Sequence, residues 1–393
     1  MAEKKKVLLI IDANSLIHRA YHALPPLSTA KGEAVNAVYG FLSMLFKAIK
    51  EFKPAYIAAT FDVAGPTMRH KKFKAYKAQR VKAPDELYNQ FPIVKEALAS
   101  LCIPVYEKEG FEADDLIGTI AKKVSVNHQE NPVETVILSG DLDTLQLVDA
   151  HTKVYTMRKG IQDSVLYDEK AVQDKFGGLL PSQMEDYKGL RGDPSDNIPG
   201  VLGVGEKTAV LLVKEFGSLE QLYEALESGS AGDRVKPKLK EKLIQEKSKA
   251  FLSKELGTID QDAPITWKLT DAAWESFNKE EAAKLLSRFE FGSLLSRMPG
   301  AKQESPQQND TTQEKIEQLY RDQVLSKEIY ELEKSLMPIL RAMEKTGIKI
   351  DKPYFQKLSQ EMEEELGVLR LKIHEKAGKE FNINSTQQLA EVL

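Results

Sequence analysis

Three acidic side chains are crowded into one short stretch of the chain. Glu112, Asp114 and Asp115 fall within four positions of GFEADDLI (110–117), between apolar neighbours. One interpretation is the start of a helix, where acids complement the positive end of the helix dipole. The other is a site for a divalent metal ion, and the rest of the sequence must decide between them.

Further acids occur where strand-like runs or turns end. They are Asp12, Asp62, Asp141, Asp143, Asp193 and Asp196. Each alone is explained as a turn or cap residue. If all these acids converge, their charges repel and raise one another's pKa unless cations neutralise them. Mg²⁺, or Mn²⁺ in its place, prefers such carboxylate oxygens. The pattern therefore predicts two Mg²⁺ ions and phosphoryl chemistry, in which the ions activate water and stabilise the entering and leaving oxygens.

Four short apolar runs rich in β-forming residues must position these acids. They are VLLIID (7–12), AYIAATFD (55–62), ETVILSGD (134–141) and KVYTM (153–157). Near-continuous apolarity is typical of parallel strands that are buried on both faces. Helical patterns such as AVYGFLSMLFKAIKEF and DLIGTIAKKVS lie between the runs, which predicts an α/β fold with a parallel sheet. Three of the runs end in aspartate, and ligands of such sheets bind beyond the carboxyl ends of the strands.

The segment 65–84, GPTMRHKKFKAYKAQRVKAP, is strongly basic and contains no acid. Its cations are Arg69, Lys71, Lys72, Lys74, Lys77, Arg80 and Lys82, with Phe73 and Tyr76 between them. A solvated basic helix is the structural explanation. Because the segment follows Asp62 directly, we expect it to overhang the acidic site. Basic side chains with interleaved aromatics suit a single-stranded nucleic acid.

A glycine-rich turn, NIPGVLGVGEKTAVLLVKEFG (197–217), precedes a helix that is predicted to begin near Glu206. The glycines of the turn are Gly200, Gly203 and Gly205. Backbone N–H groups at such a turn can bind a phosphate. A P-loop is excluded, because Glu206 intervenes before Lys207 and Thr208 and no strand precedes the turn. A helix-hairpin-helix grip on duplex DNA fits better, and a purely structural turn is the alternative.

Composition narrows the class of protein. With 393 residues, of which 42% are hydrophobic, the chain has material for two or more domains. The net charge of −4 says nothing about nucleic acid, so only local patches are informative. The single cysteine, Cys102, excludes a disulfide framework and fits a reducing cytosol. The histidines show no paired ligand spacing, so zinc is not expected. No stretch reaches the ~18 apolar residues of a membrane span, so we expect no membrane partner.

The chain is expected to divide into four parts. They are an α/β core with its basic segment (1–170), a helical region with the glycine turn (171–298), a flexible linker (299–313) and a helical segment (314–393). The linker lacks apolar anchors. Beyond it, apolar periodicity with charged outer faces predicts two long helices.

Several stretches, taken in order, resemble the 5′ nuclease domain of bacterial DNA polymerase I, which belongs to the flap endonuclease superfamily. They are LLIIDANSLIHRAYHALP, AVYGFLSML, FDVAGPTMRHKKFKAYKAQR, GFEADDLIGTIAKK, ILSGDLDTLQL, GLRGDPSDNIPGVLGVGEKTA and RFEFGSLLSRM. The resemblance covers roughly residues 5–298. It implies a PIN-like core with a parallel central sheet, a helical arch and a helix-three-turn-helix DNA-binding region, followed by a linker and C-terminal helices.

The resemblance also implies a function. Its members cleave DNA near the junction of a 5′ single strand and a duplex, using two Mg²⁺ ions. The expected substrates are 5′ flaps, nicked or gapped duplexes and RNA primers annealed to DNA. A non-catalytic module that binds DNA junctions through the turn and the arch is the alternative. The protein is expected to be a monomer in the cytoplasm, associated with the nucleoid.

Roles are carried over by motif. The first metal ion would be held by Asp12, Asp62, Glu112 and Asp114, and the second by Asp115, Asp141, Asp143, Asp193 and Asp196. Catalytic cations would be Arg69, Lys77 and Arg19. Substrate would be bound by Lys72, Tyr76, Arg80, Gly200, Gly203, Gly205, Lys207 and Thr208, with Tyr76 available for stacking on a base. In the family such a glycine turn can also bind K⁺.

Residues 314–393 resemble the opening of a polymerase domain, around the thumb. No 3′–5′ exonuclease-like domain precedes them, and the sequence ends before any palm carboxylates. We therefore expect no polymerase or proofreading activity from this chain. Whether it is a natural short protein or a fragment stays open.

The first acidic stretch yields a geometric expectation. An ideal helix turns about 100° per residue, so Glu112 and Asp114 would point to nearly opposite sides of it. For both to bind one ion, the helix must begin within the stretch and leave Glu112 in extended backbone. The two carboxylates should then converge and face Asp12 and Asp62.

Overall fold

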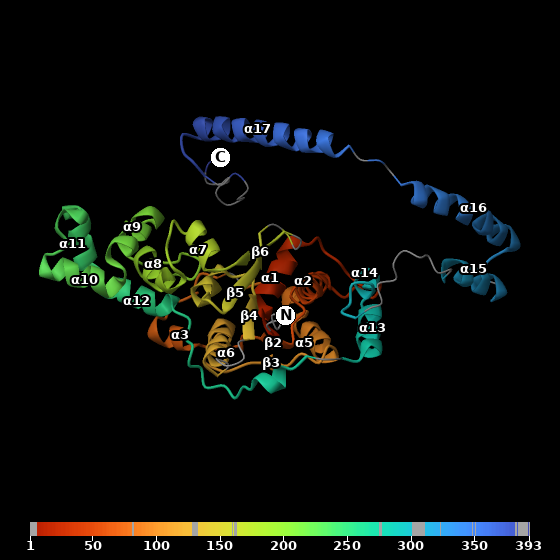
Figure 1. Ribbon diagram of the computed structural model, residues 1–393, viewed down its shortest axis with the longest axis horizontal. Coiled ribbons are helices and arrows are strands. Elements are labelled where there is room, and N and C mark those ends of the chain that lie inside the picture. Colours follow the sequence, from red (N-terminus) through yellow and green to blue (C-terminus); the bar gives the residue numbers. More distant parts are fainter. Residues whose placement is uncertain are drawn as a thin grey trace, which may run out of the picture. The chain divides into compact units, whose positions relative to one another are not determined.

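The computed structural model divides the chain into two compact units, Met1–Gln303 and Glu304–Leu393, and each is described by itself (Figure 1). The structure describes residues 6–80, 82–127, 133–158, 160, 163–274, 277–300, 311–322, 324–347, 349, 351–381, 383 and 392. The predicted linker at 299–313 lies largely outside the described residues. Its boundaries, and those of the other predicted parts, stay predictions.

A six-stranded sheet with the order β3-β2-β1-β4-β5-β6 forms the centre of the first unit. Its strands are β1 (Lys6–Asp12), β2 (Tyr56–Thr60), β3 (Val105–Tyr106), β4 (Val133–Leu138), β5 (Thr152–Met157) and β6 (Ser164–Tyr167). All neighbouring strands pair in parallel except β5 and β6, which are antiparallel. The predicted parallel sheet is confirmed, and all four apolar runs form strands. Strands β3 and β6 were not predicted.

The helices of the first unit cover both faces of this sheet. They are α1 (Ala13–Ala23), α2 (Asn36–Phe52), α3 (Met68–Lys72), α4 (Asp85–Tyr88), α5 (Phe91–Ser100), α6 (Ala113–Asn127), α7 (Glu169–Lys175), α8 (Met184–Arg191), α9 (Glu206–Phe216), α10 (Leu219–Ser228), α11 (Pro237–Gln245), α12 (Lys247–Gly257), α13 (Lys279–Arg288) and α14 (Gly292–Leu295). In the basic segment 65–84, only the short α3 is helical, and turns follow it.

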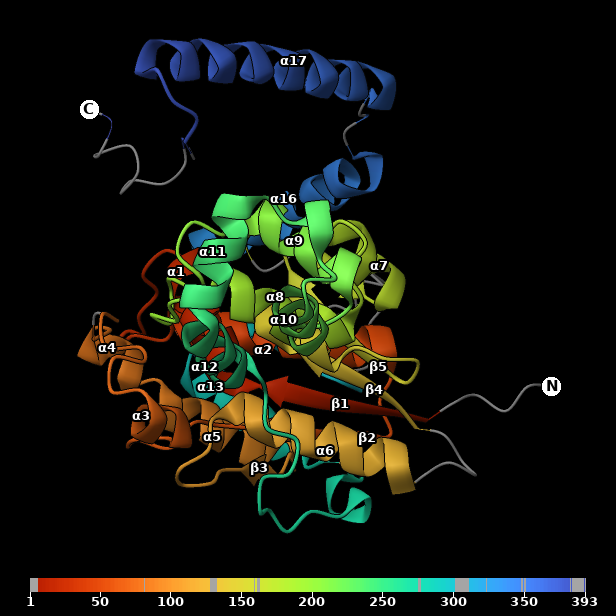
Figure 2. The same ribbon diagram turned by 90° about the vertical axis from the view of Figure 1, so that its left-hand side faces the viewer.

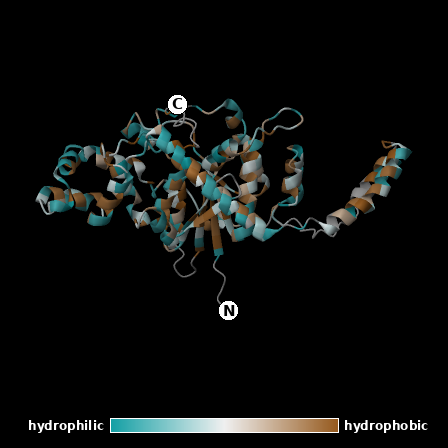
Figure 3. Ribbon diagram, turned by 90° about the horizontal axis from the view of Figure 1, so that it is seen from above, coloured by the Kyte–Doolittle hydropathy of each residue, from teal (hydrophilic) through white to brown (hydrophobic). Residues whose placement is uncertain are grey.

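Strand β1 explains why the apolar runs do not alternate. Leu9 and Ile11 belong to a core that also contains residues of α1, α2, α5, α13 and α14. Leu8 and Ile10 belong to a second core, on the other face, with residues of α6 and α8 to α12. Both faces of the strand are therefore buried, as is usual for parallel sheets. The strands stand out as hydrophobic ribbons in Figure 3.

The order of the strands creates a crevice at one edge of the sheet. From β1 the chain first adds β2 and β3 on one side, and then β4, β5 and β6 on the other. Such a reversal between β1 and β4 leaves an opening beyond the carboxyl ends of these strands, where α/β proteins bind ligands. Strand β1 points toward the side of the molecule on which α3 and α4 lie (Figure 2).

The second unit consists of helices within the residues that the structure describes. They are α15 (Thr311–Arg321), α16 (Lys327–Thr346) and α17 (Lys352–Ala377). The prediction of two long helices is confirmed by α16 and α17, and the shorter α15 before them was not predicted. The Ser326 hydroxyl accepts a hydrogen bond from the backbone N–H of Ile329 at 3.4 Å and so starts α16 as a separate helix. Among the described helices, none is long and apolar enough to cross a membrane.

Candidate active site

Asp12 lies at the crevice between β1 and β4. It ends β1 and caps α1, where its carboxylate accepts a hydrogen bond from the backbone N–H of Ser15 at 3.2 Å. Its second oxygen accepts a hydrogen bond from the hydroxyl of Ser139, just after β4, at 2.6 Å. The buried carboxylate of Asp12 thus connects the carboxyl ends of β1 and β4.

Asp62 and Glu112 face one another beside Asp12. Asp62 accepts a hydrogen bond from the backbone N–H of Ala113 at 2.7 Å, at the start of α6. Desolvation raises the pKa of Asp62, and the negative charges of Asp12 and Glu112 raise it further. The hydrogen bond from Ala113 acts in the opposite direction and lowers the pKa. Helix α6 begins at Ala113, so Glu112 precedes the helix as the sequence predicts.

Asp115 is used by the helix start itself. It accepts a hydrogen bond from the backbone N–H of Glu112 at 3.0 Å, while the Glu112 carbonyl accepts one from the N–H of Asp115 at 3.1 Å. This reciprocal pattern caps the first turn of α6. The helix-start interpretation therefore accounts for Asp115, although it does not account for Glu112 or Asp114.

Asp114 carries a buried carboxylate oxygen, Oδ1, for which the structure shows no hydrogen-bond partner. Burial raises the pKa of Asp114 well above its usual value, and the neighbouring charges of Asp115 and Glu112 add to the shift. An orphaned buried oxygen among other carboxylates is costly unless a cation approaches it. This observation fits a divalent metal ion at Asp114.

Asp141 and Asp143 extend the acids along the crevice. Asp141 caps the 3₁₀ helix Leu142–Leu147 by accepting a hydrogen bond from the backbone N–H of Asp143 at 2.9 Å. Burial raises the pKa of Asp141 to about 6, helped by the charges of Asp143 and Asp12. Asp141 therefore lies close to both neighbours.

Lys188 closes this end of the crevice. Its buried ammonium forms an ion pair with Asp143 and lies 3.4 Å from Oδ2 of Asp193. Asp193 also accepts hydrogen bonds from the backbone N–H and the hydroxyl of Ser195. Sequence reasoning missed Lys188. The signal was its position in EDYKGLRGD, immediately before the acids of the glycine turn.

The basic segment reaches into the other end of the crevice. Nζ of Lys77 donates to Oε2 of Glu112 at 2.7 Å and lies 3.8 Å from Oδ2 of Asp196. Arg80 forms an ion pair with Asp196. The backbone N–H of Lys77 also donates to the carbonyl of Asp196 at 2.9 Å, which fixes the segment to the 193–198 loop.

Tyr76 lies in the same place, but its ring is only 3% exposed. Its hydroxyl donates to Oε2 of Glu112 at 3.1 Å, and the ring meets that of His70 edge-on. The structure thus does not present Tyr76 for the base stacking that the resemblance implied, because the ring is packed inside the segment.

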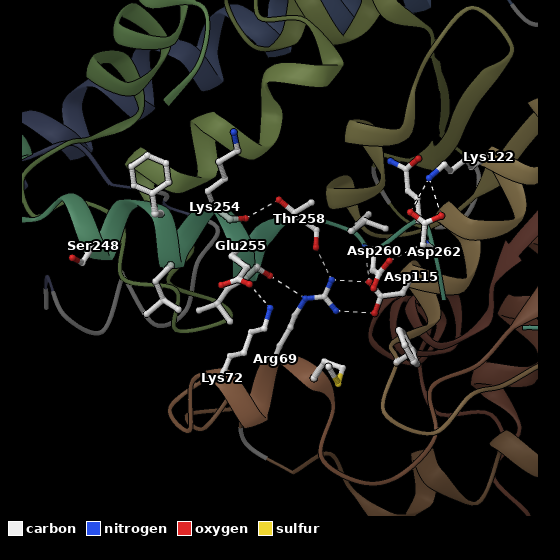
Figure 4. A pocket seen from close by; sticks show the side chains of 17 residues that line it. Arg69, Lys72, Asp115, Lys122, Ser248, Lys254, Glu255, Thr258, Asp260 and Asp262 are labelled. Atoms are coloured by element: carbon white, nitrogen blue, oxygen red, sulfur yellow. Dashed lines mark hydrogen bonds and ion pairs between the residues drawn. The ribbon is translucent and has the colours of Figure 1, made fainter. Parts of the chain in front are cut away.

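Arg69 does not face the crevice openly either. Its guanidinium donates to both oxygens of Asp115, at 2.9 and 2.7 Å, and to the carbonyls of Leu256 and Thr258 (Figure 4). Burial alone would lower the pKa of Arg69, but the pairing with Asp115 outweighs it and raises the pKa. Arg69 therefore clamps α3 to α6 and to the end of α12. Lys72, on the same helix, is paired with Glu255 at the surface.

Arg19 lies beside the loop that follows β4. Its Nη2 donates to the carbonyl of Arg158 at 3.0 Å, whereas its Nε is buried without a partner. A Cβ placed on Gly140 would lie 3.5 Å from Cδ of Arg19, which shows how closely the side chain follows this loop. Arg19 is thus near Asp141, on the side of α1.

The glycine turn leads into α9 as predicted. Gly200 and Gly203 have φ values of 61° and 84°, which favour glycine, and a Cβ on Gly200 would collide with the backbone of Gly192 at 2.4 Å. The N–H of Gly200 donates to the hydroxyl of Ser253 at 2.9 Å and is not free for a phosphate. Gly205 precedes α9, and Lys207 is exposed in its first turn, followed by the half-buried Thr208.

Together these contacts form a continuous row of charges, which we call the acidic edge. It consists of Lys188, Asp193, Asp143, Asp141, Asp12, Asp62, Asp114, Glu112, Asp196, Lys77 and Arg80. The sequence predicted that its acids would converge. Among the described residues, however, no group of three His, Cys, Asp or Glu side chains is arranged to hold a metal ion. Lysine and arginine occupy the space between the carboxylates instead.

Comparison with known proteins adds an independent finding. A family model for the 5′–3′ exonuclease N-terminal resolvase-like domain matches residues 7–177, and one for the 5′–3′ exonuclease C-terminal SAM fold matches residues 179–280. The chain is 45% identical over 298 residues to DNA polymerase I of Bacillus subtilis, covering 76% of this chain and 33% of that protein. It is 42% identical over 305 residues to DNA polymerase I of Bacillus caldotenax, covering 77% and 34%. The chain spans about a third of the length of these curated relatives.

Solved structures show the same fold. A T5 5′-exonuclease with divalent metal ions (zinc) bound is 19% identical with a TM-score of 0.52, covering 72% of this chain and 98% of that chain. A bacteriophage T5 flap endonuclease in complex with DNA and metal ions is 20% identical with a TM-score of 0.51 and the same coverage, 72% and 98%. At these identities the likeness extends to the fold alone.

Proposed function

The chain belongs to the 5′–3′ exonuclease family, whose members are metal-dependent nucleases acting on phosphodiester bonds, and from this premise we propose its substrates and site. It acts on 5′ flaps, nicked or gapped duplexes and RNA primers annealed to DNA. Cleavage falls near the junction of the 5′ single strand and the duplex and leaves a 5′-phosphate. The acidic edge is the observation that carries this proposal.

The acidic edge suits hydrolysis of a phosphodiester because it combines acids with cations that face them. The ions proposed are two Mg²⁺, with Mn²⁺ able to substitute; when bound, they supply Lewis-acid activation of water and of the phosphate. Asp114 offers an oxygen without a partner beside Glu112 and Asp115, and Asp62 lies near Asp12 and Glu112. The donor set is one of hard oxygens, as Mg²⁺ requires.

The cations of the basic segment have a second role in this proposal. Lys77 and Arg80 now neutralise Glu112 and Asp196. If those acids held the metal ions, Lys77 and Arg80 would be available to the scissile phosphate and would stabilise the charge that develops on it. Lys188 does the same from the other end of the row. Arg19 contacts a phosphate near Asp141. Asp115 and Arg69 hold the start of α6 in position.

The glycine turn is proposed to bind the downstream duplex. Lys207 and the exposed backbone of Gly203 and Gly205 lie at the start of α9, where N–H groups and the helix dipole favour an anion. Bound K⁺ at the turn is part of the proposal. Residues 314–393 are proposed to correspond to the opening of a polymerase domain. The protein is proposed to be a monomer of the cytoplasm.

A 5′-flap oligonucleotide incubated with the protein and Mg²⁺ tests the function. We expect cleavage at the junction that stops when the metal is chelated. Binding of the flap without any cleavage would instead support the alternative, a non-catalytic DNA-junction-binding module. The ion pairs of Lys77, Arg80 and Lys188 with acids of this edge are the observation that favours this alternative.

A further inference from the structure

A second cavity, which we call the basic pocket, lies at the opposite edge of the sheet from the acidic edge. It has a volume of ≈ 970 Å³ and is lined by residues of α2, the segment leading into β2, the 274–279 region and the chain after α14. Lys53 and Pro54 precede β2, and the N–H of Ala55 donates to the carbonyl of Val7 at the start of β1, at 2.9 Å. Since β1 rises about 3.3 Å per residue, roughly 20 Å separate the two edges.

The lining of the basic pocket has one sign of charge. Its cations are Lys47, Lys50, Lys53, Lys279 and Arg297, and no Asp or Glu is among the described residues that line it. The cavity behind α3, by contrast, contains Asp115, Glu255, Asp260 and Asp262 beside its cations. Converging cations without acids repel one another until an anion joins them.

Helix electrostatics do not explain this convergence. Lys50 and Lys53 lie at the carboxyl end of α2, where the helix dipole favours cations. Lys279, however, is the first residue of α13, the end at which the dipole disfavours a cation. Its ammonium donates to the carbonyl of Gly300 at 2.8 Å. Arg297 comes from yet another segment and donates to the carbonyl of Ser43 at 3.4 Å.

Two aromatic rings form a fixed wall of the basic pocket. Trp274 and Phe277 stack with ring centroids 5.7 Å apart and an interplanar angle of 15°. The indole N–H of Trp274 donates to the carbonyl of Leu101, and its backbone N–H donates to that of Ala55, both at 2.9 Å. The wall is therefore preorganised, which reduces the entropy that a ligand must overcome.

We propose that the basic pocket binds a nucleotide, either free or as part of a single strand. The base lies against Trp274 and Phe277, and the phosphates lie among Lys50, Lys53, Lys279 and Arg297. Stacking on aromatic rings combined with phosphate contacts is the usual chemistry of single-strand binding. A cavity of this size falls within the roughly 300–1,000 Å³ of ligand sites. The site needs no metal ion and is separate from the acidic edge.

Quenching of the Trp274 fluorescence reports on this site directly. The chain has two tryptophans, and Trp267→Phe leaves Trp274 alone. That background change removes no hydrogen bond of the indole, because Nε1 of Trp267 is buried without a partner. The probes are adenosine diphosphate and a thymidylate tetramer, titrated in EDTA so that metal-dependent binding at the acidic edge is absent. We expect saturable quenching by at least one probe. Quenching by the tetramer alone identifies a strand site, and quenching by the diphosphate alone identifies a site for free nucleotides.

Neutral variants test the role of the cations. Lys50→Gln, Lys53→Asn and Arg297→Gln together should weaken binding at least tenfold, and Asn at position 53 tolerates the φ of 47° there. For the tetramer, the slope of log affinity against log salt should fall by about 2, from about 0.7 per lost cation. Neutralising three exposed cations elsewhere, Lys31, Lys170 and Lys238, is the matched control and should change neither quantity.

Three results would overturn the proposal. One is the absence of saturable quenching by both probes up to millimolar concentration. Another is binding that the neutral variant retains in full while the protein stays folded by circular dichroism. The third is displacement of the bound probe by tetraglutamate at equal concentration, which would mean that the basic pocket recognises charge without a base. None of these results depends on nuclease activity.

Discussion

The acidic edge and the basic pocket both contain lysine and arginine side chains, but the charges that surround these cations differ. At the acidic edge, Lys77, Arg80 and Lys188 each face a carboxylate. In the basic pocket, no Asp or Glu is among the described residues that line it. The acids of the acidic edge are partly neutralised by its own cations, whereas the described lining of the basic pocket carries positive charge alone.

The difference indicates how each cavity can respond to a ligand. A carboxylate that is paired with lysine can exchange that lysine for a metal ion, and the released lysine can then pair with a phosphate. The carboxylate and the lysine each have a partner of opposite charge before and after this exchange, so little is lost when substrate and metal enter together. No such exchange is available in the basic pocket, where binding of an anion simply removes repulsion.

The largest expected effect comes from removing one carboxylate of the acidic edge. Asp62→Asn should lower flap cleavage more than about 10³-fold, because loss of a direct ligand exceeds the 10–100-fold cost typical of an outer-shell partner. DNA binding should be largely preserved, since the residue carries no phosphate contact. Single-turnover cleavage and fluorescence anisotropy measure the two effects. Asp174→Asn, an exposed acid of α7, is the control and should be fully active. A fully active Asp62 variant would remove Asp62 from the site.

The second prediction concerns the clamp that holds the acidic edge in place. Arg69→Met leaves Asp115 buried without its partner and should destabilise the protein by about 3–5 kcal/mol, as for other broken buried ion pairs. Urea denaturation measures the change. Arg234→Met removes an exposed partner of Glu215 and should cost at most about 1 kcal/mol. If Arg69→Met were as stable as the control and lost only activity, Arg69 would be a phosphate contact and not a clamp.

The third prediction separates the cations of the basic segment. Lys77→Ala should lower turnover about 10²-fold or more, as expected when one group that stabilises transition-state charge is removed. Its effect on duplex affinity should be small, because Lys77 faces the carboxylates rather than the exterior. Lys82→Ala, which removes an exposed lysine paired with Asp85, should change neither quantity much. Equal losses of turnover and affinity in Lys77→Ala would instead indicate simple phosphate binding.

The fourth prediction uses the metal itself. Excess acids at the edge are stabilised by a divalent cation, so Mg²⁺ at about 100 times its dissociation constant should add about 2.7 kcal/mol to the free energy of unfolding. Thermal unfolding in Mg²⁺ and in EDTA gives this difference. It should shrink in Asp62→Asn and persist in the neutral variant of the basic pocket. An identical melting temperature in Mg²⁺ and EDTA would contradict the proposed ions.

Some of these features could be predicted from the sequence, and others could not, for physical reasons. The four main strands were predictable because burial on both faces leaves an uninterrupted apolar run, and their terminal aspartates follow from the polarity of a parallel sheet. Strand β3 has only 2 residues and β6 is partly exposed, so neither leaves a clear pattern. The partners of Arg69 are distant in sequence, because Asp115 lies 46 residues and Leu256 lies 187 residues further along the chain. Only folding brings them together. The basic pocket is assembled from separate segments, so local sequence carries no sign of it, and the only local sign of Lys188 is its position just before the acids of the glycine turn.

The smallest expected effect tests whether the basic pocket is independent of the acidic edge. Lys50→Gln, Lys53→Asn and Arg297→Gln together should leave the rate of flap cleavage within about twofold of the original. The reason is the distance of roughly 20 Å between the two edges, which exceeds the Debye length of about 8 Å at physiological salt. Cleavage of a short flap in Mg²⁺, at several salt concentrations, measures the effect. If cleavage fell tenfold and recovered at low salt, the basic pocket would belong to the path of the substrate, and the two cavities would form a single nucleic-acid site.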